Sequence, residues 1–268
     1  VQTDTAEALK LAGNIVEEAL KVDPALRESM TTALTECTVI RLRSEPKVVS
    51  DAEAPKVFGI SGVPGKPLEY IQNNYENQGK IVLDHATGLM WMQEDNAEGI
   101  LWKEALTYAE NMVFAGYSDW RLPDVKELQS IVDYTRSPAT TGTAAIDPLF
   151  FCTQITNEAG EEDFPWYWSN TTHGTWVDGH EGAWGAYVSF GRSLGNMTGL
   201  PEDAGKMPPM ASSKLNISTD SNWIDVHGAG SQRSDPKAGD PSRYAEGHGP
   251  QGDAIRIYNH VRLVRNTD

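Results

Sequence analysis

Apolar residues near the start of the chain recur at the spacing of an α-helix, and they predict two consecutive helices. Asp4 with Glu7 three residues later is the capping-box pattern that begins a helix, and Asp23-Pro24 supplies the N-cap and first position of the second helix. We expect residues 1–36 to form a helical hairpin, whose apolar stripe must be covered by the rest of the protein or by a neighbouring subunit. The stripe consists of Ala8, Leu9, Ala12, Ile15, Val16, Ala19 and Leu20, followed by Leu26, Met30, Ala33 and Leu34.

The next stretch, residues 37–69, shows little periodicity. Thr38–Leu42 is a short β-prone run, and proline and glycine then recur from Pro46 to Pro67. This composition predicts an irregular connector. The main domain is therefore expected to span residues 70–268.

Two further helices are predicted within this domain. The second has the clearer beginning, because Asp124 can act as its N-cap and Glu127 stands at the third helical position, with Pro123 just before. The apolar positions are Trp102, Leu106, Ala109 and Met112 in one helix and Val125, Leu128, Ile131 and Val132 in the other.

Strands are predicted later in the chain. Tyr167–Thr172 and Ala186–Phe190 are rich in β-forming residues, and apolar positions alternate from Ile255 to Leu263 along a closing strand. Residues 191–252 are crowded with Gly, Pro, Ser and Asp, which predicts a long irregular stretch. Helices and strands mix without a βαβ period, so we expect an α+β fold.

The charge of the chain narrows the choice of partners. A formal net charge of −16 repels phosphate backbones and anionic lipid, so neither nucleic acid nor a membrane surface is an expected partner. Residues 151–204 contain one base, Arg192, against eight acids, which makes this region a candidate cation site. The acids are Glu158, Glu161, Glu162, Asp163, Asp178, Glu181, Glu202 and Asp203.

Export is the expected fate of the chain. No apolar run is long enough to span a membrane, and the sequence begins at Val1, which suggests that a leader has been removed. We therefore expect an extracellular or cell-surface location. In an oxidising compartment Cys37 and Cys152 are candidates for a disulfide, while two buried free thiols are the alternative interpretation.

Several short sequence motifs within residues 70–265 resemble those of the Lcl C-terminal domain family, which is named after a bacterial collagen-like adhesin. They are Asp84-His85-Ala86-Thr87-Gly88-Leu89-Met90-Trp91, Trp102-Lys103-Glu104-Ala105, Gly116-Tyr117-Ser118-Asp119-Trp120-Arg121-Leu122-Pro123, Lys126-Glu127-Leu128, Tyr167-Trp168-Ser169 and Val261-Arg262-Leu263-Val264-Arg265. The resemblance implies a C-type-lectin-like domain: two flanking helices, small antiparallel sheets, termini joined in one sheet, and long loops on a variable face.

The resemblance also bears on particular residues. Members often carry Cys where this chain has Leu263, so it implies that Cys37 is the remaining partner for Cys152. Large rings bury much area, so Trp91, Trp102 and Trp120 are expected in the core. We expect Arg121 to stack or pair structurally, and Arg262 and Arg265 to hold carboxylates such as that of Asp119.

No pattern in the sequence points to catalysis. A nucleophile elbow, a phosphate-binding loop and a dinucleotide fingerprint are all missing from the chain, and so is the cysteine or histidine chemistry of enzymes in the related superfamily. His173, Asp178, His180 and Glu181 are metal-ligating residue types, but their spacing matches no recognised site. We therefore predict that the protein is not an enzyme.

Two binding chemistries remain as hypotheses. Asp225, Asp235, Asp240 and Asp253 are candidate calcium ligands in a Gly- and Pro-rich stretch, although Asp side chains that cap loop backbone are the alternative. Trp166, Trp168, Trp176 and Trp184 are candidate rings for stacking on a sugar, although each ring taken singly fits a core position.

These features favour two functions. As a binding or adhesion module, the protein would recognise an extracellular glycan, protein or matrix through its loop face. As a structural subunit, it would self-associate through the N-terminal hairpin and build a filament or sheath, since contacts that do not close generate fibres.

Overall fold

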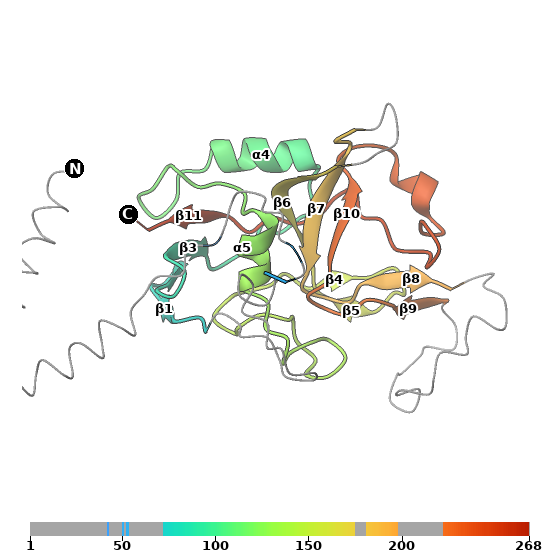
Figure 1. Cartoon of the computed structure of the whole chain (residues 1–268), viewed down its shortest axis with the longest axis horizontal. Coiled ribbons are helices and arrows are strands. Elements are labelled where there is room, and N and C mark those ends of the chain that lie inside the picture. Colours follow the sequence, from blue (N-terminus) through green and yellow to red (C-terminus); the bar gives the residue numbers. More distant parts are fainter. Residues whose placement is uncertain are drawn as a thin grey trace, which may run out of the picture. The chain divides into compact units, whose positions relative to one another are not determined.

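The computed structural model describes residues 42, 50, 52–53, 72–174, 181–197 and 222–267 (Figure 1). All of them belong to one compact unit, residues 41–268. The hairpin predicted for residues 1–36 and nearly all of the connector predicted for 37–69 lie outside the described residues. Self-association through the hairpin therefore stays a prediction. The described part is a mixed α+β structure with small antiparallel sheets and few helices.

The first sheet joins strands from both ends of the described region. It contains β1 (Tyr75–Asn77), β2 (Ile81–Asp84), β3 (Leu89–Met92) and β11 (Val264–Asn266), in the order β1-β2-β3-β11. All pairs are antiparallel, and Val264 lies opposite Trp91. The buried Asp84 holds the β2–β3 turn, because its carboxylate accepts hydrogen bonds from the backbone of Asn74 and Ala86 and from the Thr87 hydroxyl.

The closing strand is much shorter than its apolar alternation predicts. Ile257, Val261 and Leu263 are buried as expected, but regular pairing begins only at Val264. The preceding segment makes single bridges instead, from Asn259 to Ile100 and from His260 to Tyr167. Burial is continuous from Asn259 to Arg265, so the segment crosses the core with both of its faces covered, and the alternation of apolar residues is not an alternation of burial.

The second sheet contains β6 (Trp166–His173), β7 (Trp184–Ser189) and β10 (Gln232–Pro236), in the order β10-β7-β6. The strands predicted around Tyr167 and Ala186 are thereby confirmed. The predicted irregular stretch 191–252 is wrong in part, because it also contains β8 (Leu194–Asn196), β9 (Trp223–Asp225) and the 3₁₀ helix η1 (Pro241–Tyr244). The strands β4 (Ile155–Thr156) and β5 (Glu162–Asp163) form a separate hairpin.

Both predicted body helices are present, as α4 (Trp102–Glu110) and α5 (Val125–Ser130). Asp124 caps α5 as predicted: its carboxylate accepts from the backbone N–H groups of Lys126 and Glu127, and Glu127 accepts in return from the N–H of Asp124. Figure 1 shows α4 along one margin and α5 against the β6–β7 strands. Across the described residues no helix has the length and apolar character needed to cross a membrane.

Tryptophans and arginines predicted to be structural are largely confirmed. Trp91 and Trp120 are buried in the core, while Trp102 is only partly buried and donates its indole N–H to the carbonyl of Ser169. Arg265 binds Asp119 through two hydrogen bonds of 2.8 and 3.0 Å, as predicted.

The other two arginines differ in their partners. Arg121 forms a two-pronged pair with Glu127, which confirms a structural role. Arg262 is fully buried, but it mainly holds the carbonyl oxygens of Met92, Gln93 and Phe151, with the Asp95 carboxylate farther away at 3.8 Å. The expectation of a carboxylate partner is therefore only partly met there.

Candidate functional site

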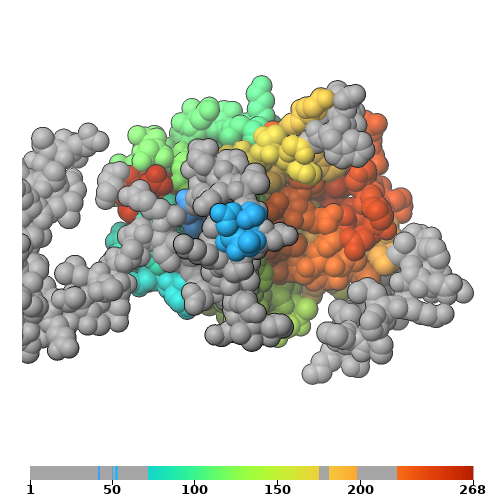
Figure 2. All heavy atoms as spheres, viewed as in Figure 1, coloured from blue at the N-terminus to red at the C-terminus, as the bar shows by residue number. Residues whose placement is uncertain are grey.

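A cavity of about 500 Å³ lies along β10 at the edge of the second sheet, and we call it the β10 cavity. One wall comes from the adjoining ends of β6 and β7, and the other from the segment that follows η1. In Figure 2 the orange-to-red surface of residues 222–267 adjoins the yellow surface of the β6–β7 hairpin. The lining residues are His173, Trp184, Tyr187, Gln232, Arg233, Ser234, Asp235, His248, Asp253, Ala254 and Ile255.

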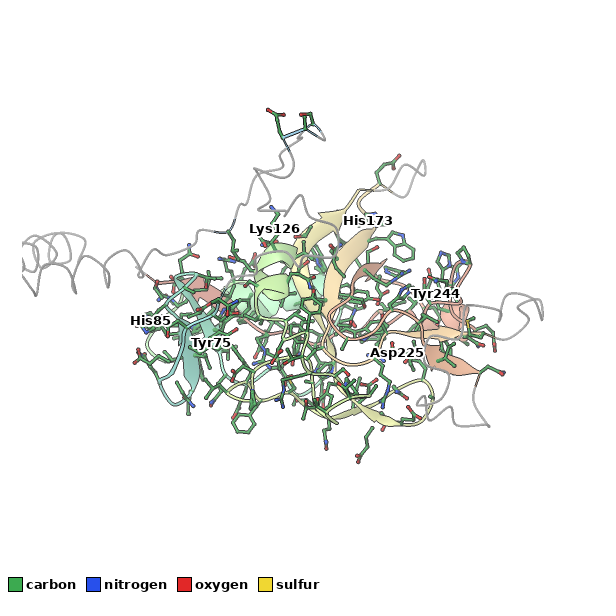
Figure 3. All side chains as sticks on the ribbon, turned by 60° about the horizontal axis from the view of Figure 1, so that its bottom comes forward. Tyr75, His85, Lys126, His173, Asp225 and Tyr244 are labelled. Carbon is green, nitrogen blue, oxygen red and sulfur yellow. The ribbon has the colours of Figure 1, made fainter. Side chains whose placement is uncertain are left out.

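Aromatic rings form much of the outer part of this cavity. The ring centroids of Trp184 and His248 are 5.7 Å apart, and Tyr244 packs edge-on against His248 at 6.0 Å. His173 is the cross-strand partner of Trp184, and its Nδ1 lies 2.8 Å from the Ser234 hydroxyl, which holds the imidazole against β10. His173, at the end of β6, and Tyr244, in η1, are labelled in Figure 3.

An arginine whose charge is balanced by a neighbouring aspartate lies beside the rings. Arg233 stands opposite Tyr187 in the sheet and forms an ion pair with Asp253. The other carboxylate oxygen of Asp253 is 2.7 Å from His227 Nε2. The arginine charge is therefore matched within the protein, and its remaining N–H groups and the carboxylate can still hydrogen-bond to a neutral ligand.

Asp235 is an acidic residue of the lining with only 1% of its surface exposed. Burial raises the pKa of this carboxyl to about 8, against the opposing effect of hydrogen bonds from the Arg256 backbone and the Asn259 side chain. Both of these bonds go to Oδ2, at 2.9 and 3.3 Å. Oδ1 has no hydrogen-bond partner, so the protein leaves one oxygen of this carboxyl unused.

The residues that hold Asp235 belong to a larger buried network. Arg256 binds the carboxylate of Glu158 through two hydrogen bonds of 2.7 and 2.8 Å, and its guanidinium lies 3.8 Å from the centre of the Trp166 ring. Burial opposes the charge of Glu158, but the Arg256 hydrogen bonds and charge prevail and lower the pKa of that carboxyl. Glu158 and Arg256 therefore form an ionised pair with no net charge.

The predicted sugar-stacking rings have different positions. Trp166 and Trp168 are 1% and 0% exposed and belong to the hydrophobic core, which is the position that each ring taken singly was expected to fit. Trp166 also lines a second, smaller cavity, so a ligand role for these rings stays a prediction. Trp184, at the start of β7, lines the β10 cavity. Trp176 lies outside the described residues.

The four predicted calcium ligands do not converge on one point. Asp225 accepts from the backbone N–H groups of Ser193 and Gly228, and Asp240 caps η1 by accepting from Ser242. Asp235 and Asp253 line the β10 cavity but already have protein donors. Within the described ranges no three His, Cys, Asp or Glu residues are grouped to hold a metal ion, so the four aspartates are not one ligand set.

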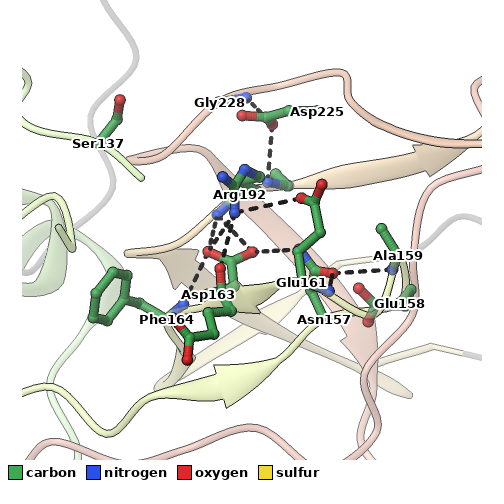
Figure 4. Close-up of polar contacts among 12 residues, drawn as sticks. Ser137, Asn157, Glu158, Ala159, Glu161, Asp163, Phe164, Arg192, Asp225 and Gly228 are labelled. Carbon is green, nitrogen blue, oxygen red and sulfur yellow. Dashed lines mark hydrogen bonds and ion pairs between the residues drawn. The ribbon is translucent and has the colours of Figure 1, made fainter. Parts of the chain in front are cut away.

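The acidic region predicted as a second cation site is occupied by protein donors as well (Figure 4). Asp163 accepts from the backbone of Phe164 and Arg192 and from the Asn157 amide, while Asn157 accepts from the backbone of Ala159 and Glu161. These contacts fold the β4–β5 hairpin. Asp163 therefore serves the backbone, while Glu158 and Glu161 pair with the side chains of Arg256 and Arg192.

Two other sequence hypotheses are only partly described. Cys152 has no disulfide partner among the described residues, and burial is the main cause that raises the pKa of its thiol. Cys37 lies outside the described residues, so the bond between the two stays a prediction. The same holds for Asp178 and His180 of the weak metal-ligand pattern, whereas His173 belongs to the β10 cavity.

Sequence reasoning missed several residues of the site. Tyr187, Arg233, His248, Arg256 and Asn259 carry no motif, and they are brought together by pairing between strands far apart in the chain. One signal was available. Arg233 and Asp235 alternate on a short run, as residues on one face of a strand do.

Comparison with known proteins identifies the domain. The family model of the Lcl C-terminal domain matches residues 80–203. No curated protein and no solved structure matches the chain. The matched region includes the β6–β7 wall of the β10 cavity, whereas the wall from residues 232–255 lies beyond it. Residues 80–203 of this chain thus match the Lcl C-terminal domain family, which supports the resemblance found in the sequence.

Proposed function

We propose that this protein is a non-enzymatic binding module of the cell surface or extracellular space, with a C-type-lectin-like fold, and that the β10 cavity receives a saccharide unit of an extracellular glycan. The observation that carries the proposal is the make-up of that cavity. It combines partly exposed aromatic rings with a neutral set of hydrogen-bonding groups.

The chemistry of a sugar fits both halves of this lining. A pyranose ring has C–H faces that pack on an aromatic ring such as Trp184, and hydroxyls that both donate and accept. Gln232, Arg233 and Asp253 offer donors and acceptors along one side of the cavity. Ligand cavities of about 300–1,000 Å³ are usual for small molecules, and the volume of about 500 Å³ lies in that range.

Charge favours a neutral ligand over an ionic one. Arg233 is paired with Asp253, and the raised pKa of Asp235 keeps that carboxyl mainly protonated at neutral pH. An anion or a cation would therefore meet little unmatched charge. The net charge of −16 also disfavours acidic partners at longer range.

Replacing Trp184 tests the proposal. On an array of bacterial and host glycans, we expect the intact protein to bind a subset of sugars and Trp184→Ala to bind them at least about tenfold more weakly, since loss of a stacking ring costs about 1–3 kcal/mol. Phe151→Ala is the matched control, because Phe151 is an exposed ring outside the cavity lining. Equal loss in both variants, or no glycan signal for the intact protein, contradicts the proposal.

A further inference from the structure

A second, smaller cavity adjoins the network that holds Asp235, and we call it the Arg256 cavity. Its volume is about 270 Å³, and it is lined by Ile155, Thr156, Glu158, Pro165, Trp166, Arg256, Tyr258, Asn259 and His260. Arg256 and Asn259 also donate to Asp235, which lines the β10 cavity. The two cavities therefore share one buried polar network.

This network contains a concentration of unused hydrogen-bonding atoms. Among the described residues six buried side-chain nitrogen or oxygen atoms have no hydrogen-bond partner, and three of them belong to Asp235, Arg256 and Asn259. Leaving such an atom unpaired costs about 1–3 kcal/mol, so native proteins seldom keep several together without a bound partner. Two of the three, Arg256 Nη1 and Asn259 Oδ1, belong to residues that line the Arg256 cavity.

The two atoms have fixed and opposite roles. Arg256 uses Nε and Nη2 on Glu158, which leaves the N–H groups of Nη1 as free donors. Asn259 is 1% exposed, and its Nδ2 donates to the Arg256 carbonyl at 2.8 Å and to Asp235 Oδ2 at 3.3 Å. Because both neighbours of Nδ2 are acceptors, the amide cannot be reversed without loss, and Oδ1 remains an acceptor.

His260 adds a further acceptor to the lining. Its Nδ1 is 2.8 Å from the carbonyl oxygen of Asn96, and a carbonyl can only accept, so Nδ1 carries the ring proton. In the neutral imidazole Nε2 is then unprotonated. Nε2 can accept a hydrogen bond from a ligand in the cavity.

The charges around the cavity exclude an ionic ligand. Glu158 and Arg256 neutralise each other through two hydrogen bonds, so an anion would face Glu158 and a cation would face Arg256 without compensation. Besides the free N–H groups of Arg256 Nη1 and the neutral acceptors, the lining includes Thr156 and Tyr258, whose hydroxyls can donate or accept. Its complement is a neutral ligand with an acceptor next to a donor.

We propose that the Arg256 cavity is a second binding site, which takes a small neutral group that presents an acceptor beside a donor, as an acetamido group or two neighbouring hydroxyls do. The acceptor faces Arg256 Nη1 and the donor faces Asn259 Oδ1. Trp166 holds the guanidinium in place from one side. Tyr258, 48% exposed, forms the outer part of the lining. This site does not depend on what the β10 cavity binds.

Nuclear magnetic resonance of the tryptophan indole N–H groups separates the two cavities in the full chain. Trp166 lines the Arg256 cavity and Trp184 lines the β10 cavity. Because Trp166 also stacks on Tyr187 of the β10 lining, with ring centroids 4.6 Å apart, a Trp166 shift is assigned to the Arg256 cavity only when the blocking variant below removes it. The probe is N-acetylglucosamine, which carries an acetamido group and neighbouring hydroxyls. We expect a saturable shift of the Trp166 signal, and no shift with acetate or methylammonium at the same concentrations.

A blocking variant completes the test. Thr156 is exposed and lines the cavity, so Thr156→Trp fills its mouth and should weaken the response at Trp166 at least about tenfold. Thr140→Trp is the control, since Thr140 is exposed and bonds only within its own loop. A flat Trp166 titration, or an unchanged one in Thr156→Trp, overturns the second site. A shift confined to Trp184 overturns it as well, while leaving the β10 proposal intact.

Discussion

Asp163 and Asp235 are both buried aspartates in short strands, and burial raises the pKa of both carboxyl groups, yet their surroundings differ. In the β4–β5 hairpin, both oxygens of Asp163 receive N–H donors from Arg192, and Phe164 and Asn157 add one each. At the β10 cavity, Asp235 has donors on Oδ2 only. Burial alone therefore does not distinguish a structural acid from a site acid; the number of donors does.

The space around the two carboxyl groups differs in the same direction. A Cβ added to Gly191 would lie 2.2 Å from the Phe164 carbonyl oxygen and 2.5 Å from Asp163 Oδ1. A Cβ added to Gly249, next to the cavity residue His248, would meet no atom within 4 Å. The contrast holds for these two positions and not for the whole of either region, since Gly160 in the β4–β5 turn meets nothing within 4 Å and Gly247, the other neighbour of His248, would meet the Gly252 carbonyl oxygen at 2.0 Å.

The largest effect is expected from these two glycines. Gly191→Ala should lower the free energy of unfolding by about 3 kcal/mol or more, because the backbone at Phe164 has to move. Gly249→Ala should cost only about 1 kcal/mol, from its left-handed φ of 74°. Urea denaturation monitored by tryptophan fluorescence measures both. Similar costs would mean that the two positions are equally packed.

The next largest change in the free energy of unfolding is expected when each of the two aspartates is replaced by asparagine. Asp163→Asn should cost about 2 kcal/mol, because the new amide nitrogen has to face N–H donors. Asp235→Asn should cost less than about 1 kcal/mol, because its amide nitrogen can take the place of the unpaired Oδ1. Chemical denaturation at pH 6 compares them, with circular dichroism of the folded variants as the control. The reverse order would contradict the donor count.

Taken per pH unit, the dependence of stability on pH is smaller than the cost expected for Gly191→Ala or for Asp163→Asn. The pKa of Asp235 is about 8 in the folded state against the ordinary value of 3.8 for an aspartate carboxyl, so the folded state binds an extra proton between these two pH values. The stabilisation is complete below about pH 4 and is lost as the pH rises toward 8, at no more than about 1.4 kcal/mol per pH unit. Asp235→Asn should flatten this slope. Denaturation midpoints of both proteins, measured from pH 4 to 9, test this prediction. An unchanged slope in Asp235→Asn would rule out Asp235 as the source of the pH dependence of stability.

Local signals were sufficient for much of the fold. The Asp124 cap needs only residues within one helical turn, and the burial of Trp91 and Trp120 follows from ring size alone. The Arg265–Asp119 pair was also predicted, although the two sequence motifs that contain these residues lie far apart in the chain. These features agree with the sequence because each depends on few other parts of the chain.

The site depends on distant contacts, and for that reason most of it was not predicted. Asp235 was assigned to calcium from its Asp-, Gly- and Pro-rich setting, but its register opposite Gly185 in the sheet buries it instead. Strand β10 has no apolar alternation to reveal it, since its residues are Gln, Arg, Ser, Asp and Pro. Only the assembled sheet brings Asp235 together with Arg256 and Asn259.

The antiparallel pairing of β11 with β3 has a consequence for how the molecule is made. A chain leaves the ribosome N-terminus first, so β3 is synthesised long before residues 264–266 can reach it. Until then the β3 edge is a row of unpaired backbone groups, open to strands of other nascent chains. The longest-range pairing in this sheet should therefore set the pace of folding, and that edge is where a chaperone would have to act.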